Sequence, residues 1–239
     1  AQDLPTDAVA VVDDVPTGIV TVALDDRGVP TYTIHEPAAW DCMPSCASLE
    51  LAAGVDVVCF GTLAQRQAQS REAIHTFLAH TPVSAWRVLD VNFRLGIYTA
   101  EIIEQSLAAA NVLKINDDEL EILRTFYELP AGEEAALRVL AERFELQAAV
   151  LTRGAAGSLA ISGAASSEQP VVATEIIDTV GAGDAFGAAF VVALEAGQPL
   201  DDAHALAAQV AGFVCSQSGA MSPLPKEVLR QWNRQDPRT

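Results

Sequence analysis

From Val55 onward, short apolar runs alternate with helical stretches, and this alternation limits the fold more than any other feature of the sequence. The apolar runs are nearly continuous, which is typical of strands buried on both faces. Such strands, separated by amphipathic helices, predict a parallel sheet covered by helices and therefore an α/β fold. The expected extended segments are residues 55–60, 87–91, 111–115, 148–152, 158–161 and 171–172. The expected helices are residues 70–80, 99–109, 117–126, 133–144, 182–195, 201–217 and 226–232.

Residues 17–35 follow a different pattern and stand apart from the rest of the chain. Two runs rich in β-branched and aromatic residues flank Asp25-Asp26-Arg27-Gly28, which predicts a β-hairpin with a glycine-containing turn. With 239 residues and a 50% hydrophobic composition, the chain can bury a sizeable core. We therefore expect a β-rich flap attached to an α/β body.

The charge balance argues against two classes of partner. The chain has 14 Lys and Arg residues against 32 Asp and Glu residues, so nucleic acid and anionic membranes would repel its net charge of -18. No apolar run approaches the roughly 18 residues of a membrane span without a charge or a glycine. A phosphate site in this chain must therefore depend on backbone amides, a metal ion and a few local cations.

The cysteines favour a reducing location. Cys42, Cys46, Cys59 and Cys215 follow no regular framework, and no secretory leader precedes them. Cys42 and Cys46 have no second Cys or His pair at metal-ligand spacing, which argues against a zinc site. We expect a cytoplasmic protein.

The turn Gly181-Ala182-Gly183-Asp184 lies between an extended apolar segment and an apolar helix. Small residues let backbone N–H groups approach a ligand, and the first turn of a helix leaves such donors unpaired at its positive end. The turn therefore predicts an anion hole in which Asp184 could accept a proton from an attacking hydroxyl.

Other interpretations of this turn are a helix cap at Asp184 or dinucleotide binding by its glycines. The GxGxxxG spacing and the late position in the chain disfavour a dinucleotide. The sequence has no GxxxxGK[ST] motif, so an ATP enzyme of this sequence is not of the P-loop type. It also has no GxSxG motif, which leaves a hydrolase triad without support.

Polar side chains follow two of the expected strands. The alternate spacing of Asp90, Asn92 and Arg94 can project all three toward one side of an extended segment, which suits recognition of hydroxyl and phosphate groups. Ligands of open α/β sheets gather at the carboxyl ends of strands, although a solvated loop is the alternative.

Lys114, Asn116 and Glu119 follow the next strand. The spacing of Asn116 and Glu119 predicts a helix N-cap with a capping-box partner, and the same pair could organise water around a magnesium-nucleotide. Gly154 and Gly157 mark a tight turn, which is either an ordinary connection or a surface for nucleotide phosphate.

Four motifs together resemble the ribokinase-like, phosphofructokinase B-type carbohydrate kinases. They are DTVGAGDAF at 178–186, NxxE at 116–119, TRGAAG at 152–157 and SGAMSPLP at 218–225. Within that family, CFGTLAQR at 59–66 and DVNFR at 90–94 are most similar to the fructokinase branch. The resemblance covers nearly the whole chain and implies a three-layer α/β sandwich with a mainly parallel central sheet. It also implies that residues 17–35 contribute to a small β-sheet lid over the sugar.

The resemblance implies a role for each matched residue. Asp184 matches the catalytic base, and Arg94 matches an arginine near the transferred phosphate. The anion hole is matched by Gly181, Ala182 and Gly183. Asp90 and Asn92 are expected at the sugar. The residues expected at the nucleotide are Lys114, Asn116, Glu119, Thr152, Gly154, Gly157, Gly219 and Ala220. Asn116 and Glu119 are expected to hold Mg²⁺ through water, and Asp178 and Val180 to contact K⁺.

The implied activity is transfer of the γ-phosphate of ATP to a hydroxyl of a small sugar, fructose to fructose 6-phosphate. The expected partners are ATP, the sugar and a second copy bound through the lid. Nothing in residues 1–16 resembles the strand and Gly-Gly-x-x-x-Asn segment that open the family, so residues 1–239 are expected to form one domain lacking that segment. The alternatives are a catalytically impaired nucleotide-binding remnant, or a kinase for ribose, a nucleoside or 2-keto-3-deoxygluconate.

Overall fold

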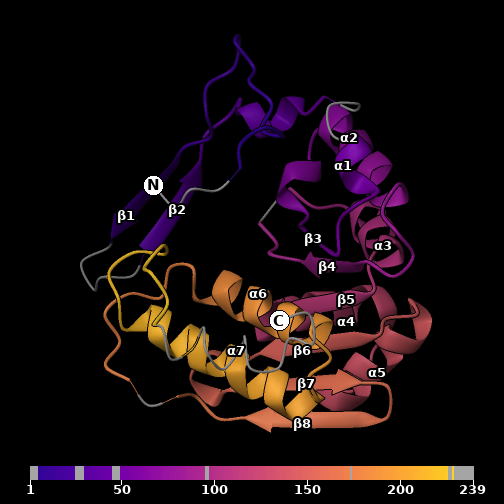
Figure 1. Ribbon diagram of the computed structural model, residues 1–239, viewed down its shortest axis with the longest axis vertical. Coiled ribbons are helices and arrows are strands. Elements are labelled where there is room, and N and C mark those ends of the chain that lie inside the picture. Colours follow the sequence, from indigo (N-terminus) through magenta and orange to yellow (C-terminus); the bar gives the residue numbers. More distant parts are fainter. Residues whose placement is uncertain are drawn as a thin grey trace.

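The computed structural model describes residues 5–24, 30–44, 49–94, 97–172, 174–225 and 228, which form a large and a small sheet (Figure 1). The large sheet has six strands in the order β3-β4-β5-β6-β7-β8. They are β3 (Val57–Phe60), β4 (Trp86–Asp90), β5 (Val112–Asn116), β6 (Ala148–Thr152), β7 (Ser158–Ser162) and β8 (Ala165–Gln169). Strands β3 to β6 are parallel, whereas β7 pairs antiparallel with β6 and with β8. The expected α/β class with a mainly parallel sheet is confirmed.

Helices cover both faces of the large sheet. Successive strand residues point to opposite sides, and the apolar residues on each side pack against a different set of helices. The helices are α1 (Leu49–Ala52), α2 (Ala68–Ala79), α3 (Ala100–Ala109), α4 (Asp117–Tyr127), α5 (Glu133–Arg143), α6 (Ala182–Glu195) and α7 (Leu200–Cys215). Leu89 and Leu113 belong to the core cluster that contains α3, α4 and α5. Val88 and Val112 pack instead with α6 and α7, which lie across one face of the sheet in Figure 1. This arrangement is the expected three-layer sandwich.

The observed helix starts match the expected ones where the capping residue is close in sequence to the first helical residue. The Thr99 hydroxyl accepts a hydrogen bond from the Ile102 N–H at 3.2 Å and so caps α3. Helix α6 occupies all of the expected residues 182–195. A cap of this kind typically stabilises a helix by about 1 kcal/mol. The residues that form it lie within four positions of one another, so the sequence alone can indicate it.

The small sheet is the hairpin expected in residues 17–35. Strands β1 (Val20–Leu24) and β2 (Pro30–Ile34) pair antiparallel, and they lie to one side of the large sheet in Figure 1. The expected turn at residues 25–28 lies outside the described residues. Three single turns of 3-10 helix complete the described elements: η1 (Ala39–Cys42), η2 (Leu63–Gln65) and η3 (Gly154–Ala156).

The end of the large sheet differs from the expectation. Strand β8 was not expected, because ASSEQ has no apolar alternation, and Ser167 is its one buried residue. Residues 171–172 follow β8 without joining the sheet. The expected helix at 226–232 lies, apart from residue 228, outside the described residues. Of the helices within the described ranges, none is both long enough and apolar enough to cross a bilayer.

A buried histidine lies between α7 and the sheet. His204 is fully buried, and its Nε2 lies 2.7 Å from the Ser158 hydroxyl. The rings of Phe186 and Phe190 meet it edge-on. Burial lowers the pKa of His204 from 6.5 to about 4, against a raising effect from Asp201. The folded protein therefore favours the neutral ring.

We predict that the free energy of unfolding falls as the pH drops from 6.5 toward 4, because the unfolded chain protonates His204 before the folded chain does. Between pH 7.5 and pH 5 this residue contributes a loss of about 2 kcal/mol. Urea unfolding of the wild type and of His204→Gln at both pH values isolates that contribution, since the other titrating groups are shared. An equal pH dependence in the two proteins would contradict the prediction.

Candidate active site

The carboxyl ends of four parallel strands meet at one edge of the large sheet. Strand β3 ends at Phe60, β4 at Asp90, β5 at Asn116 and β6 at Thr152. In the strand register, Asp90 lies beside Lys114 and Asn116 lies beside Thr152. Ligands of open α/β sheets bind at this edge, and the first turn of α6 also lies here.

Lys114 connects the strand ends to the start of α6. Its Nζ lies 2.7 Å from Asp90 Oδ2, and the two side chains are 11% and 23% exposed. A Cβ added to Gly183 would lie 3.2 Å from the Lys114 Nζ, and one added to Gly187 would lie 3.5 Å from its Cδ. The contact at Gly183 would be tight, so glycine there lets α6 approach the lysine, whereas a Cβ at Gly187 would make an ordinary van der Waals contact. Lys114, which was expected at the nucleotide, is paired with Asp90 beneath the helix start.

Negative charge is concentrated around this ion pair. Burial raises the pKa of Asp90, Lys114 opposes that rise, and the charge of Asp184 adds to it. Burial raises the pKa of the Cys59 thiol, and Asp90 and Asp184 raise it further. Cys59 therefore lies near both aspartates, although its place inside an apolar run offered no sign of this. Lys114 is the cation that offsets the two carboxylates.

Two loops hold the turn that precedes α6. Asp178 accepts hydrogen bonds from the N–H groups of Val180 at 2.9 Å and Gly219 at 3.0 Å, which lower the pKa of Asp178. Gly181 has a φ of 79°, and a Cβ there would lie 2.5 Å from the Ala220 Cβ. Both facts require glycine at this position. Gly219 and Ala220, expected beside adenine, therefore brace the turn.

The first turn of α6 presents backbone donors beside an exposed carboxylate. The Ala182 N–H donates to the Thr179 carbonyl at 3.2 Å. Within the described part of the chain, the N–H groups of Gly183 and Asp184 have no such backbone partner. Of the three residues expected to form the anion hole, Gly181 and Gly183 thus have N–H groups for which the described residues supply no backbone acceptor, and the N–H group of Asp184 adjoins them. The side chain of Asp184 is exposed, so a hydroxyl could reach it.

A cavity of 450 Å³ lies beside this turn. It brings together Thr152, Gly154 and Gly157 from the connection after β6 with Ala182 and Gly183 from α6. Its other walls are mostly apolar and come mainly from residues 170–172, 174 and 176 and from α7. The volume is within the usual range for ligand pockets, and apolar walls beside unpaired N–H groups suit a flat heterocycle that carries phosphates.

Asn116 and Glu119 form the expected capping box. Each side chain accepts a hydrogen bond from the other residue's backbone N–H at 2.8 Å. The second Glu119 oxygen accepts from the Phe93 N–H at 3.0 Å, which ties the end of β4 to the start of α4. Burial raises the pKa of Glu119, and its hydrogen bond to the Asn116 N–H opposes that rise.

The capping box suits a magnesium ion that is held through water rather than by direct protein ligands. Among the described residues, no three His, Cys, Asp or Glu side chains gather as metal ligands. Magnesium often keeps several waters and takes most of its other ligands from substrate phosphates. Asn116 and Glu119 suit an ion of that type, which they would contact through water.

Asn92 and Arg94 lie beyond the end of β4. The strand stops at Asp90 and Asn92 has a φ of 44°, so the expected extended run does not continue to Arg94. Both side chains are exposed, and Arg94 Nη1 donates to the Phe93 carbonyl at 3.1 Å. The charge of Arg94 lowers the pKa of Asp90, which places the guanidinium within electrostatic reach of the ion pair.

A family profile described as pfkB family carbohydrate kinase matches residues 1–227. The chain belongs to the pfkB family. Members of this family are phosphotransferases, and the resemblance inferred from the four sequence motifs is thereby confirmed.

Two relatives indicate the range of sugars within the family. A fructokinase of Salmonella typhimurium is 29% identical over 233 residues, covering 92% of this chain and 73% of the relative. A 2-dehydro-3-deoxygalactonokinase of Haloferax volcanii is 30% identical over 155 residues, covering 63% of this chain. That alignment spans 48% of the relative, about half of its length.

Solved structures agree with the fold. A sugar kinase from Pyrococcus horikoshii superposes with a TM-score of 0.79 and 22% identity, covering 96% of this chain and 74% of that chain. A fructokinase with bound ATP from Xylella fastidiosa has a TM-score of 0.79 and 20% identity, with coverage of 94% and 76%. A fructokinase from Vibrio cholerae, bound to fructose, ADP and calcium, has a TM-score of 0.74 and 22% identity, with coverage of 92% and 74%.

We predict that Lys114→Met lowers the free energy of unfolding by about 3 kcal/mol, because it leaves a half-buried carboxylate without its cation. The double variant Lys114→Met with Asp90→Asn should be more stable than Lys114→Met alone, since it removes the uncompensated charge. Urea unfolding at pH 7 of both single variants and the double variant measures this coupling. Strictly additive losses would show that the two side chains do not act as a pair.

Proposed function

We propose that this chain is an ATP-dependent sugar kinase that transfers the γ-phosphate to a hydroxyl of a small ketose, with fructose as the leading substrate. The main support for the proposal is that a cavity suited to a nucleotide adjoins the start of α6. The 450 Å³ cavity, lined by the turn at residues 152–157, reaches Gly183, directly before the exposed Asp184. A nucleotide in the cavity would therefore direct its phosphates toward the start of α6 and Asp184.

The proposed reaction uses groups of this chain at each position. The N–H groups of Gly183 and Asp184 stabilise charge on the transferred phosphoryl group, in an orientation fixed before the substrate arrives. Asp184 accepts the proton of the attacking hydroxyl. Arg94 adds positive charge from the end of β4. Lys114 does not need to touch the nucleotide in this scheme, since it supports the helix start from below.

Two ions belong to the proposal. Magnesium, carried by ATP, supplies neutralisation of phosphate charge, and Asn116 and Glu119 would contact it through water. We place potassium beside Asp178 and Val180, at the turn that supports the anion hole. Asp178 already accepts two backbone N–H groups, and a cation there would add to that support.

The choice of sugar draws on the relatives. The Salmonella and Xylella proteins are both named fructokinases, and the Salmonella protein aligns along 92% of this chain. The Haloferax protein favours a second candidate, a six-carbon 2-keto-3-deoxy acid, because its name specifies that class of substrate. Asp90 and Asn92 stay our proposed contacts to the sugar in either case.

The flap of β1 and β2 is proposed to act as a lid over the sugar and as a dimer surface. Val20 and Val22 lie on one face of β1 and are 45% and 50% exposed, and Ile19, directly before β1, is 58% exposed. A second copy could cover this apolar surface. The free thiols of Cys42, Cys59 and Cys215 suit a reducing compartment, and we propose that the protein acts in the cytoplasm.

We predict that the wild type, supplied with Mg-ATP, phosphorylates fructose faster than ribose, adenosine or 2-keto-3-deoxygluconate. The measurement follows ADP release and the phosphorylated sugar together. Asp184→Asn should lower the turnover by at least about 100-fold, because it removes the base. Binding of Mg-ADP should stay within about threefold of the wild type, because the nucleotide cavity is intact.

Asp202→Asn is the matched control, since Asp202 is also an exposed aspartate in the first turn of a helix. It should retain full turnover. If Asp184→Asn keeps more than about a tenth of the turnover, the base is a different group. A wild type that binds ADP but phosphorylates none of the four acceptors would support the impaired-remnant alternative.

A further inference from the structure

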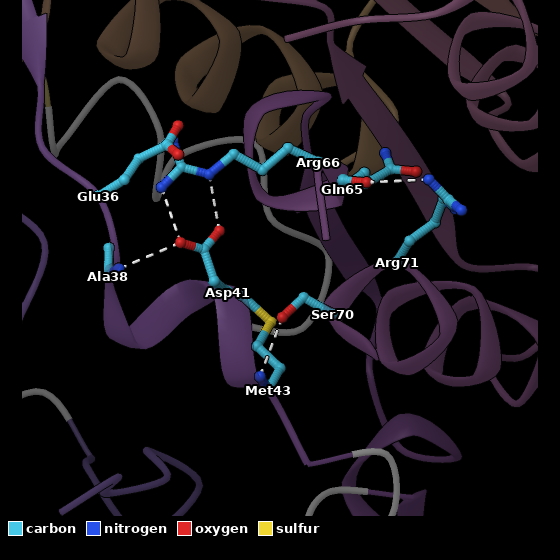
Figure 2. Close-up of polar contacts among 8 residues, drawn as sticks. All are labelled: Glu36, Ala38, Asp41, Met43, Gln65, Arg66, Ser70 and Arg71. Atoms are coloured by element: carbon cyan, nitrogen blue, oxygen red, sulfur yellow. Dashed lines mark hydrogen bonds and ion pairs between the residues drawn. The ribbon is translucent and has the colours of Figure 1, made fainter. Parts of the chain in front are cut away.

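A cluster of charged residues lies outside the site, where the flap joins the body of the protein (Figure 2). Arg66 Nε lies 2.7 Å from Asp41 Oδ1, and its Nη2 lies 2.7 Å from Asp41 Oδ2. The side chains of Arg66 and Asp41 are only 6% and 7% exposed. The Arg66 Nη1 also contacts Glu36 at 2.9 Å, and Glu36 is 59% exposed. A nearly buried, two-pronged ion pair thus joins residues 25 positions apart.

One end of this ion pair belongs to the base of the flap. Asp41 lies in η1, shortly after β2, and its Oδ2 accepts a hydrogen bond from the Ala38 N–H at 3.1 Å. The ring of the adjacent Trp40 lies 5.8 Å from the Arg66 guanidinium carbon. The segment leading into β1 is attached here as well, because the Ala39 N–H donates to the Pro16 carbonyl at 2.9 Å. Both arms of the flap therefore meet at η1, the turn that contains Asp41.

The other end belongs to a loop that contacts the active site. Residues 61–66 follow β3, and a Cβ added to Gly61 would lie 2.8 Å from the Asp90 carbonyl oxygen. The buried Thr62 hydroxyl donates to the Val91 carbonyl at 2.8 Å. The Gln65 amide donates to the Ser106 hydroxyl at 2.9 Å, which fixes the loop to α3. The loop that carries Arg66 is thus fastened to the end of β4.

We propose that Arg66 is a positioning residue, which fixes the base of the flap to the end of β4 so that the flap closes in register with the sugar. This role rests on the proposed function, because it assumes that the flap covers a sugar. The five-donor guanidinium binds a carboxylate at two points and so sets an orientation as well as a distance. Its hydrogen bond to Asp41, more than any other influence, holds the pKa of that carboxyl below its usual value.

The test compares Arg66→Met and Arg66→Lys with a matched control, Arg71→Met. Arg71 contacts the same loop, because its Nη1 donates to the Gln65 carbonyl at 3.3 Å, and in Figure 2 no dashed line joins it to Glu36 or Asp41. Amide hydrogen exchange is measured along the whole chain, without substrate. In Arg66→Met we expect exchange in residues 15–44 to rise by about tenfold or more, with β4 to β7 unchanged. Arg71→Met should exchange like the wild type.

Kinetics supply the second readout. With Arg66→Met we expect the KM for the sugar to rise by about tenfold, while the affinity for Mg-ADP stays within about twofold. ADP release should also exceed sugar phosphate formation, because a misplaced flap admits water to the phosphate. Arg66→Lys should give values between those of the wild type and Arg66→Met, since lysine keeps the positive charge but cannot bind the carboxylate at two points.

Each outcome separates this inference from the proposed function. Unchanged exchange in residues 15–44, or equal loss of protection throughout the sheet, would overturn the positioning role. A fall in turnover with no change in the KM for the sugar or in the ratio of ADP to sugar phosphate would overturn it too. If the wild type phosphorylates no sugar, the proposed function fails, and the exchange data still decide whether Arg66 anchors the flap.

Discussion

The close approach of α6 to the carboxyl edge of the parallel sheet is the contact on which the site depends. Lys114 lies between them, paired with Asp90, and a Cβ added to Gly183 would lie 3.2 Å from its Nζ. This packing puts the helix N-terminus, with its unpaired N–H groups, directly above the strand ends. It also leaves Asp184 at the surface of the same corner. The unpaired N–H groups, the exposed carboxylate and the wall of the 450 Å³ cavity at Ala182 and Gly183 are consequences of one helix position.

A chain with a net charge of -18 must attract phosphate locally. The means for this are backbone donors at the start of α6, the exposed Arg94 at the end of β4, and a lysine held close behind the helix. Lys114 also offsets the repulsion between Asp90 and Asp184. Arg66 is a further, nearly buried cation. Its ion pair with Asp41 joins the loop after β3, at the same edge of the sheet, to the base of the flap.

Features with local causes could be predicted from the sequence, and features with distant causes could not. The capping box of Asn116 and Glu119 and the limits of α6 followed from residues within one helical turn. The pairing of Arg66 with Asp41 joins distant segments, and no motif marks it. Strand β8 escaped prediction because an edge strand with one buried residue shows no apolar alternation. The pairing of Lys114 with Asp90 was also not predicted, because a strand-end lysine does not reveal its partner.

We propose that the nucleotide lies between the turn at residues 152–157 and α7, with its phosphates at the start of α6. A crystal structure of the protein with Mg-ADP would test this placement. We expect the adenine in the 450 Å³ cavity and the β-phosphate within hydrogen-bonding distance of the Gly183 and Asp184 N–H groups. A nucleotide bound elsewhere, such as in the apolar hollow beside α2 that Val12 and Phe77 line, would contradict it.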